Sequence, residues 1–514
     1  MNSKLIKGML TACLFYPVLS SAQIEIGAPN EIEALRYSQH TFGGTARSLS
    51  MGGAFGALGA DFSVLSTNPA GIGVYRKSEF TFSLGFNARG TDSEFLGRTE
   101  NDSRFNLDMP NLGLVLARTK KSDKAEWKQV GFAFGYNRLA NFASDVYYEG
   151  KNTENSILDS FLEALPSGGA TPDDIYFDYP FDLDLAYQTY LINPIAPDSL
   201  FYSSVIPNGG AYQSMRKTTS GGMGEFSLGF GTSYKDVVYF GVSLGFPSIR
   251  YEEESTWTES DKDNEIFVAD TNIVNRDFKS LRYNSYLETT GNGFNAKFGV
   301  IVRPIDWIRV GAAIHTPTWY NMSDIFSNSL SSSFENPGNS YEVVSPEGNF
   351  SYNLRTSFKA NGSFAVIFQQ YGLISFDYEI TNFSSSKFEP KKLDRGEYTF
   401  NGVNRVIKTL YAPFTSNFRV GTEWKYEKFA FRAGFAYYMT PFEKGIADEN
   451  NDQTMMSYTG GIGFRDKRWF VDLGYAYTQH KSSSKPYFLA SEEVPSAFHT
   501  RIDHRVITTV GWRF

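Results

Sequence analysis

The stretch EFTFSLGFN at residues 79–87 alternates apolar and polar side chains one residue at a time. Such a period of two predicts a β-strand, because successive side chains of a strand point to opposite faces of the sheet. The same alternation recurs along the chain and predicts about fourteen strands. They lie at residues 79–87, 112–116, 130–137, 226–230, 238–246, 294–302, 308–314, 354–368, 374–380, 418–426, 429–437, 456–464, 469–477 and 506–514.

Residues 352–369 decide whether the strand total is even. They hold either two strands or one, and the apolar parity is unbroken from 354 to 368. A turn usually breaks the parity, so we expect one long strand. The total is then even, as in bacterial outer-membrane barrels.

A soluble β-sandwich also has alternating strands, but three features favour a membrane barrel. The strands are about nine or more residues long, which is enough to cross a bilayer at a tilt. Their apolar face is rich in aromatic residues, which make up 16% of the chain. Short turns at 369–372, 426–429 and 465–469 alternate with long connections at 141–222, 252–279, 321–349 and 383–416. We therefore predict an all-β fold, a closed antiparallel transmembrane β-barrel of about 14 strands over residues 79–514.

The N-terminus has the layout of a secretory signal peptide over residues 1–22. Two lysines precede an apolar run, and small residues form a cleavage site before Gln23. The one cysteine, Cys13, lies inside this segment, where the alternative interpretation is a lipoprotein acylation box. Cleavage before Gln23 leaves a mature chain without disulfides or cysteine-bound metals.

Residues 23–78 do not alternate, so we do not expect them to belong to the barrel wall. Asp61 is placed to cap a short helix, and the glycines between 52 and 59 allow close backbone packing. Such a segment has little reason to be ordered outside a barrel. We expect it to form a hatch that plugs the lumen.

The stretch ARSLSMGGAFGALGADFSVLSTNPAGIG at residues 46–73 resembles the N-terminal hatch of the FadL/TodX family of outer-membrane transporters for long-chain fatty acids and aromatic hydrocarbons. Asn68, Pro69 and Ala70 match the Asn-Pro-Ala signature of that family. RPIDWIRVGAAIHTPT (303–318) and GLISFDYEITNFS (372–384) are similar to its middle strands, and the aromatic end at Phe514 resembles the last strand of outer-membrane barrels.

The resemblance implies a monomeric, fourteen-stranded barrel in the bacterial outer membrane, surrounded by membrane lipid and lipopolysaccharide. It implies uptake of hydrophobic small molecules such as long-chain fatty acids, released sideways through a gap at a kinked third strand. The connection at 141–222 is longer than the family's outer loop. The kink has no visible sequence signal, and the cargo stays open.

Four groups of residues are candidates for handling such a cargo, each with a structural alternative. Asn68, Pro69 and Ala70 are either the anchor of a gate or a simple turn before proline. Phe55, Leu58 and Phe62 either face a ligand pocket or form the small core of the hatch.

The other two groups lie in the predicted outer loop and on the barrel wall. Two amphipathic helices at 153–169 and 182–194 either form a capture groove, with Phe161, Leu162 and Leu165, or pack on each other. The polar parity of the strands turns charged residues into the lumen, where an arginine would suit a carboxylate headgroup unless the charges pair with one another or with the hatch. The candidates are Arg309, Arg355, Lys359 and Arg419, among the further charges Asp377, Glu379, Glu423, Arg432 and Asp472.

Other functions find little support in the sequence. The net charge of -8 and the lack of a basic cluster argue against nucleic acid as a partner. We expect no enzyme, because no motif for nucleophilic or metal catalysis occurs and only His499, Asp503 and His504 gather near one strand. We expect no cofactor, and unpaired histidines give no support to a heme receptor. The alternative to transport is a barrel that serves as a partner or shuttle subunit in secretion or assembly.

Overall fold

The computed structural model describes residues 29–120, 125–206, 209–263, 266, 277–335, 339–391, 399–447 and 452–514. The segment predicted as a signal peptide, with Cys13, lies outside the described residues. All further structural statements refer to the described ranges.

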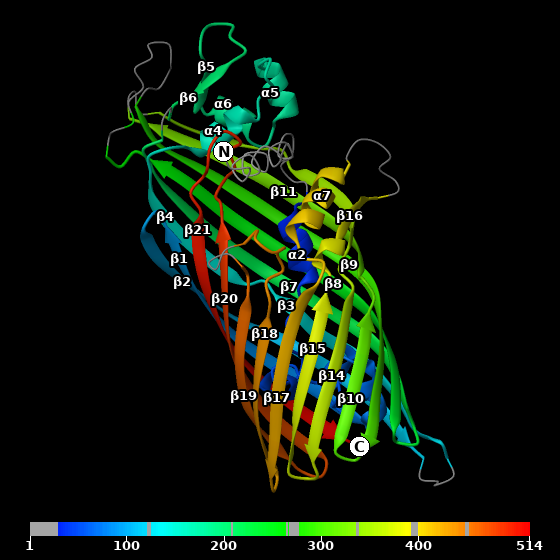
Figure 1. The fold of residues 1–514 in the computed structure, drawn as a ribbon. Coiled ribbons are helices and arrows are strands. Elements are labelled where there is room, and N and C mark those ends of the chain that lie inside the picture. The colour runs from blue at the N-terminus through cyan, green and yellow to red at the C-terminus, as the bar shows by residue number, and fades with distance from the viewer. Residues whose placement is uncertain are drawn as a thin grey trace, which may run out of the picture.

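The strands form one closed antiparallel barrel (Figure 1), because β1 pairs with β2 on one side and with the last strand, β21, on the other. Several strands are segments of one crossing, so the wall has 14 crossings, as predicted. In order around the wall they are β1 (Glu79–Phe95), β2 (Arg98–Thr119), β3 (Trp127–Asn141), β7 (Ala211–Tyr234), β8 (Val238–Ser260), β9 (Phe278–Ile305), β10 (Ile308–His315) with β11 (Trp319–Phe334), β14 (Lys359–Phe368) with β13 (Gly348–Arg355), β15 (Gly372–Thr381) with β16 (Lys387–Pro390), β17 (Thr415–Tyr426), β18 (Phe429–Tyr438), β19 (Met455–Arg465), β20 (Trp469–Ser484) and β21 (Ala497–Arg513).

The outer face of the wall is a belt of exposed apolar side chains, as expected for a barrel that faces lipid. Phe132 is 57% exposed and its cross-strand partner Phe230 is 41% exposed, whereas Ala133 beside them is buried. A soluble sandwich would bury these rings. Other members of the belt are Leu84, Phe86, Phe246, Phe298, Phe364, Phe376, Phe431, Leu473 and Val510.

Three neighbouring crossings are interrupted at one level, between β10 and β11, between β13 and β14, and between β15 and β16. Pro317 lacks the N–H that a ladder needs, and Thr318 N donates to the Thr356 side chain over 2.9 Å. The inward parity changes there: odd residues such as Ala313 are buried before the break, and even residues such as Tyr320 after it. The prediction of one crossing at 352–369 is correct, but the prediction of one unbroken parity is wrong.

Much of what the sequence suggested as long connections is strand. β8 runs to Ser260, β9 begins at Phe278 and β11 runs to Phe334, so the wall continues well into the predicted loops at 252–279 and 321–349. Hydroxyl-rich outward faces such as that of β11 hide these upper strand halves from a search for apolar alternation.

The connection between β3 and β7 forms a separate cap at the loop end of the barrel (Figure 1). It contains β4 (Ser144–Asn152), the helices α4 (Ile157–Glu163), α5 (Pro172–Asp178) and α6 (Leu183–Gln188), and the hairpin of β5 (Ile192–Pro194) and β6 (Tyr202–Ser204). A further helix, α7 (Asn401–Leu410), follows β16, and β12 (Ser340–Val344) lies between β11 and β13. No helix in the described residues is long and apolar enough to cross a bilayer.

The N-terminal segment, from residue 29 to the start of β1, lies inside the barrel. It contains α2 (Glu31–Ser38), α3 (Ala46–Ser50) and the short helices η1 (Phe62–Leu65) and η2 (Pro69–Val74). Its backbone comes so close to the wall that a Cβ at Gly241 would lie 2.1 Å from Pro69 O, and one at Gly299 would lie 1.9 Å from Asn68 Oδ1. Glycine at these inward positions is what lets the plug and wall touch. We call this segment the hatch.

Candidate functional site

Asn68 joins the hatch to the wall. It precedes η2, and its side-chain Oδ1 accepts from Ala70 N over 3.1 Å, so the turn expected from the sequence is present. Its Nδ2 also donates to Gly56 O over 2.6 Å and lies within 3.2 Å of Val300 O and 3.4 Å of Ala312 O on the wall. One fully buried amide therefore ties two parts of the hatch to two strands.

Charged residues of the wall also hold the hatch. Arg47 of α3 binds Glu423 of β17 through two nitrogens, over 2.8 and 3.1 Å. Glu423 also accepts from Arg432, which reaches Asp472 at 2.7 Å. Deeply buried charges are stable only when they are paired, and these residues are paired with one another and with the hatch.

Further wall charges contact the hatch backbone. Asp377 accepts from Phe55 N and Gly56 N, and Arg309 donates to Leu58 O over 2.6 Å. The side chains of Phe55 and Leu58 pack against Ala365 and Leu373 of the wall. Phe62 packs in a second cluster with Val115 and Ala133. Of the predicted hatch residues, Phe55, Leu58 and Phe62 thus form packed contacts and do not line the pocket described next.

A polar pocket with a volume of about 80 Å³ lies between the hatch and the wall. The hatch contributes residues such as His40, Ser66 and Thr67, and the wall contributes the charged side chains. The cations Arg138, Lys297, Lys359 and Arg419 outnumber the carboxylates Glu225 and Glu379. The predicted residues Lys359 and Arg419 therefore lie together in one cavity.

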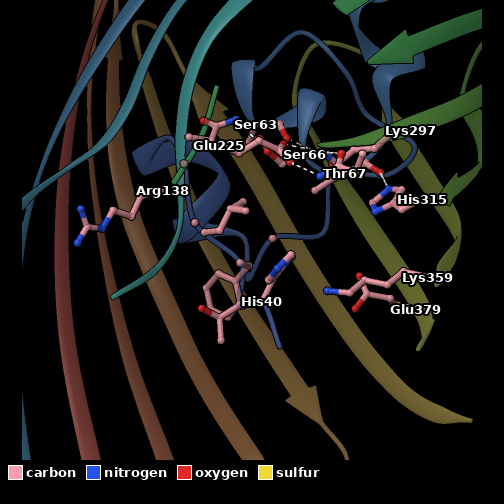
Figure 2. Close-up of a pocket in the computed structure, with 18 of the residues that line it drawn as sticks. His40, Ser63, Ser66, Thr67, Arg138, Glu225, Lys297, His315, Lys359 and Glu379 are labelled. Atoms are coloured by element: carbon pink, nitrogen blue, oxygen red, sulfur yellow. Dashed lines mark hydrogen bonds and ion pairs between the residues drawn. The ribbon is translucent and has the colours of Figure 1, made fainter. Parts of the chain in front are cut away.

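Most of these charges have partners. Glu225 binds Lys297 and Asn295, and Glu379 binds Arg419 over 2.8 Å. Lys359 differs, because its ammonium group makes no hydrogen bond or ion pair with any described residue. Figure 2 shows it beside Glu379, directed towards His40. Lys359 is the side chain best placed to bind a negatively charged group.

The two pocket histidines are not equivalent. Nε2 of His315 lies 2.8 Å from Thr67 O, which fixes that ring against the hatch. Nε2 of His40 is buried without a partner among the described residues. Burial, and then the charges of Lys359 and Lys297, hold the pKa of His40 well below its usual range. His40 is therefore neutral at pH 7 and can donate or accept one hydrogen bond.

An apolar cluster fills the lumen above the pocket, towards the loops. Leu35 and Tyr37 of α2 pack there against wall residues such as Tyr352 and against Ile407 of α7. Figure 1 shows α2 inside the barrel beneath α7. The whole cluster includes Ala34, Leu35, Tyr37, Leu139, Met223, Ile249, Tyr251, Tyr320, Met322, Tyr352, Leu354, Phe383, Phe388, Phe400, Ile407 and Tyr411. Within it, Glu33 is buried beside Asp324, and burial with that second carboxylate raises the pKa of Glu33 to about 8.

The wall is discontinuous beside the pocket. β2 pairs with β3 only from Asn111, opposite Asn137, to Thr119. β3 then bulges at Leu139, and the chain continues as β4, which pairs with β7 but not with β2. The edge of β2 over residues 98–110 therefore has no ladder partner on this side among the described strands. We call the space between this edge and β4 the β2–β4 seam.

Ion pairs span the seam. Arg104 of β2 lies 2.8 Å from Asp145 of β4, and Arg98 lies 2.8 Å from Glu149. On the outer face of the same edge, Phe105 and Leu107 are 65% and 77% exposed. The seam thus has a charged inner side and an apolar outer side. β3 is the third strand of the wall, and its register shift lies beside the seam.

The predicted helix at 153–169 is present in part as α4, with Ser156 and Asp159 forming a capping box. Phe161 is buried in a core shared with α6 and the upper strands, and Leu162 and Leu165 pack against that core. These three side chains therefore do not line an open groove. The exposed apolar residues of the cap are others, including Phe177 at 74% and Phe201 at 52%.

Arg355 is not in the lumen. It pairs with Trp319, which is 50% exposed, while the neighbouring Leu354 is buried. Because the parity changes at the interruption after Arg355, its side chain lies on the outer face. The prediction that Arg355 faces the lumen is wrong for this reason.

The histidines near the C-terminus do not assemble. His499 is buried between Ser93 and Ser484, whereas His504 is on the outer face and bonds to Tyr475. Asp503 lies inside and binds Arg89 and Arg501. No group of three or more potential metal ligands occurs among the described residues.

The pocket residues missed in the sequence carry a detectable signal. Asn295 and Lys297 occupy the polar parity of the strand predicted at 294–302, and Glu225 precedes the one at 226–230. Extending that parity would have found them. His40 and Thr67 have no such signal, because they belong to the non-repetitive hatch.

Comparisons with known proteins give a fold. No protein-family model matches the chain, and no curated protein matches it. A FadL homologue of Pseudomonas aeruginosa superposes with a TM-score of 0.53 at 12% identity, over 93% of this chain and 100% of its own. The toluene transporter TodX of P. putida superposes with a TM-score of 0.51 at 12% identity, over 92% and 99%. The expected fold is confirmed.

Proposed function

We propose that this chain, which has the fold of the FadL and TodX structures, takes up hydrophobic small molecules through the outer membrane of a bacterium. The cargo class that fits best is a single-tailed amphiphile with an anionic headgroup, such as a long-chain fatty acid. The observation that carries the proposal is the unpaired Lys359 in a cationic pocket, which lies between a packed apolar cluster and a seam in the wall.

The pocket supports binding of an anionic headgroup. A carboxylate placed between Lys359 and His40 would accept one charge-assisted bond and one neutral bond, which are stronger in a water-poor site than in water. Arg419 already binds Glu379, so it would contribute its positive charge rather than a pair of free hydrogen-bond donors. A purely hydrocarbon cargo could not form hydrogen bonds or ion pairs with Lys359, His40 or Arg419.

The apolar tail needs a separate environment. The aromatic cluster around Tyr320 and Tyr352 adjoins the pocket through Leu139, and α2 and α7 occupy it in this structure. Entry from outside therefore requires a shift of α2 or α7. We propose that Phe161, Leu162 and Leu165 support the cap that covers this entrance, rather than binding cargo themselves.

The hatch supplies the gate in this proposal. Asn68 fixes it to β9 and β10, Pro69 and Ala70 lie against Gly241 of β8, and Arg309 holds Leu58. The β2–β4 seam is the proposed exit into the lipid that surrounds the apolar belt, below the lipopolysaccharide. This mode of action needs one barrel, no catalytic step and no cofactor.

Uptake of a radiolabelled fatty acid by intact cells tests the proposal. Cells that lack their own fatty-acid transporter receive the wild-type gene, the Lys359→Gln variant or an empty vector. We expect uptake with the wild type and a marked loss with the variant at equal barrel levels. Uptake by the wild-type strain that is no higher than uptake by the empty-vector strain would contradict transport.

One observation favours the alternative of a partner subunit. The cap exposes aromatic side chains at its outer end, Phe177 and Tyr176 on α5 and Phe201 beside β6. Exposed apolar residues of this kind often mark a protein interface. Stable co-purification with one protein, together with no uptake, would support that role.

A further inference from the structure

We infer that Arg138 and Arg505, at the inner side of the β2–β4 seam, form an exit site for the anionic headgroup of the cargo and select acids over neutral hydrocarbons. Asp108 occupies this site in the absence of cargo. The inference rests on the proposed function and adds the residues that decide specificity at release.

The first argument is the position of the two arginines. Arg138 lines the pocket and lies one residue beyond Asn137, where the pairing of β2 with β3 ends. Arg505 reaches the hatch beside Gly43, which also lines the pocket. Both guanidinium groups therefore stand between the pocket and the opening in the wall.

The second argument is the loose pairing of Asp108. Its Oδ2 is 3.8 Å from Nε of Arg138 and 3.5 Å from Nη2 of Arg505, and it accepts one hydrogen bond, from Nδ2 of Asn141 over 3.3 Å. The ion pair that holds the hatch is much tighter, with Nε of Arg47 2.8 Å from Oε2 of Glu423. Oδ1 of Asp108 has no partner among the described residues, although its side chain is only 2% exposed.

The third argument is unused donor capacity. Nε of Arg138, and Nε and Nη2 of Arg505, make no hydrogen bond to a described residue. Arg138 is anchored through its other nitrogen, which donates to Gly221 O over 3.1 Å. Two guanidinium groups that share one distant carboxylate can bind a second carboxylate. Each planar guanidinium can donate two parallel hydrogen bonds to the two oxygens of such a group.

The outer side of the seam completes the site. Phe105, Leu107 and Met109 are exposed along the free edge of β2. A headgroup at Arg138 and Arg505 would let an apolar tail pass through the seam to these side chains. Asp108 then acts as a counter-ion that the headgroup displaces on its way out. A neutral molecule gains nothing from this exchange.

Transfer to lipid vesicles tests the inference. The purified full-length barrel is loaded with a long-chain fatty acid or with the primary alcohol of the same chain length, and release into vesicles is followed. For the Arg138→Gln, Arg505→Gln double variant we expect release of the acid to slow on the order of ten-fold. Release of the alcohol should stay unchanged. The matched control is Arg250→Gln, an exposed arginine on the outer face of β8.

The outcomes separate this inference from the proposed function. If the wild type carries neither compound, the proposed function fails. If the wild type carries both, and the double variant slows both equally or neither, the inference is overturned. A second variant, Asp108→Asn, removes the internal competitor and should retain the acid longer without affecting the alcohol. Equal retention in Asp108→Asn and wild type would also overturn it.

Discussion

Arg47 of the hatch and Glu423 of the wall form a two-point ion pair, with Nε to Oε2 at 2.8 Å and Nη2 to Oε1 at 3.1 Å. The pair joins residues that are 376 positions apart in the sequence. Lumenal charges of this barrel thus pair with the hatch as well as with one another, and only the few without a partner remain for a ligand.

The Arg47→Met variant should loosen the hatch. Glu423 still has its ion pair with Arg432 in this variant. We therefore expect the free energy that holds the hatch closed to fall by about 2 kcal/mol, within the range of about 1.5–3 kcal/mol for hydrogen bonds to charged groups. Hydrogen exchange of residues 46–73 measures it. Lys428→Gln, in an exposed pair with Asp466, is the control and should change nothing. Unaltered exchange in Arg47→Met would refute the anchoring role.

The Asn68→Ala variant should open the plug. It removes the cap of η2, worth about 1 kcal/mol, and the bonds to Gly56 and the wall. We expect more frequent open-channel events in planar bilayers. Asn353→Ala, a half-buried asparagine on the outward parity of β13, is the matched control. A conductance trace identical to that of the wild type would show that Asn68 does not hold the gate.

The Lys359→Gln variant should bind a fatty acid more weakly. Losing one bond to a charged partner predicts an increase in Kd on the order of ten-fold. Calorimetry of the detergent-solubilised barrel measures it. Arg355→Gln is the control, because Arg355 lies on the outer face. Equal affinities for the two variants would argue against the pocket as the headgroup site.

The packing of α2 should weaken at alkaline pH. The pKa of Glu33 is about 8 in the folded protein against an ordinary value of 4.5. A raised pKa means that the folded state holds the proton, so this stabilisation is complete below 4.5 and is lost as the pH rises through about 8. Arg36 and Glu253 also contribute to the surroundings of Glu33, with opposite effects on its pKa.

Hydrogen exchange of α2 at about pH 5 and about pH 9 checks this prediction. Glu33→Gln keeps the neutral form and should remove the difference between the two conditions. Arg405→Gln on the exposed part of α7 is the control. If α2 were equally protected at both pH values in the wild type, the buried carboxyl would not govern its packing.

The sequence predicts the lower barrel well, because lipid on one side imposes an apolar residue at every second position. It predicts the upper strands poorly, since water on the outer face allows serine and asparagine there, as on β11. Arg355 was misplaced because Pro317 breaks β10 from β11 and the change of parity spreads to the neighbouring crossing through pairing. The pattern of one strand alone cannot reveal a parity change that is caused by a proline in the neighbouring strand.

The site was predicted only in part. The polar parity of the strands predicts that Lys359 and Arg419 face the lumen. That they share a pocket with His40 depends on how the hatch folds back into the lumen. The position of the seam depends on where the pairing of β2 with β3 ends, and the sequence of one strand alone does not determine that position. Phe55, Leu58 and Phe62 were sound candidates for burial, but burial against the wall and burial around a ligand leave the same apolar signature.

The most direct test of transport is mass spectrometry of lipids extracted from the barrel after purification in a short-chain detergent. The wild type is compared with the Asn68→Ala, Pro69→Ala double variant, whose hatch is released from β9 and β10. The account predicts single-tailed anionic amphiphiles in the wild type and a clear change in their occupancy in the variant. An empty lumen in both proteins would contradict it.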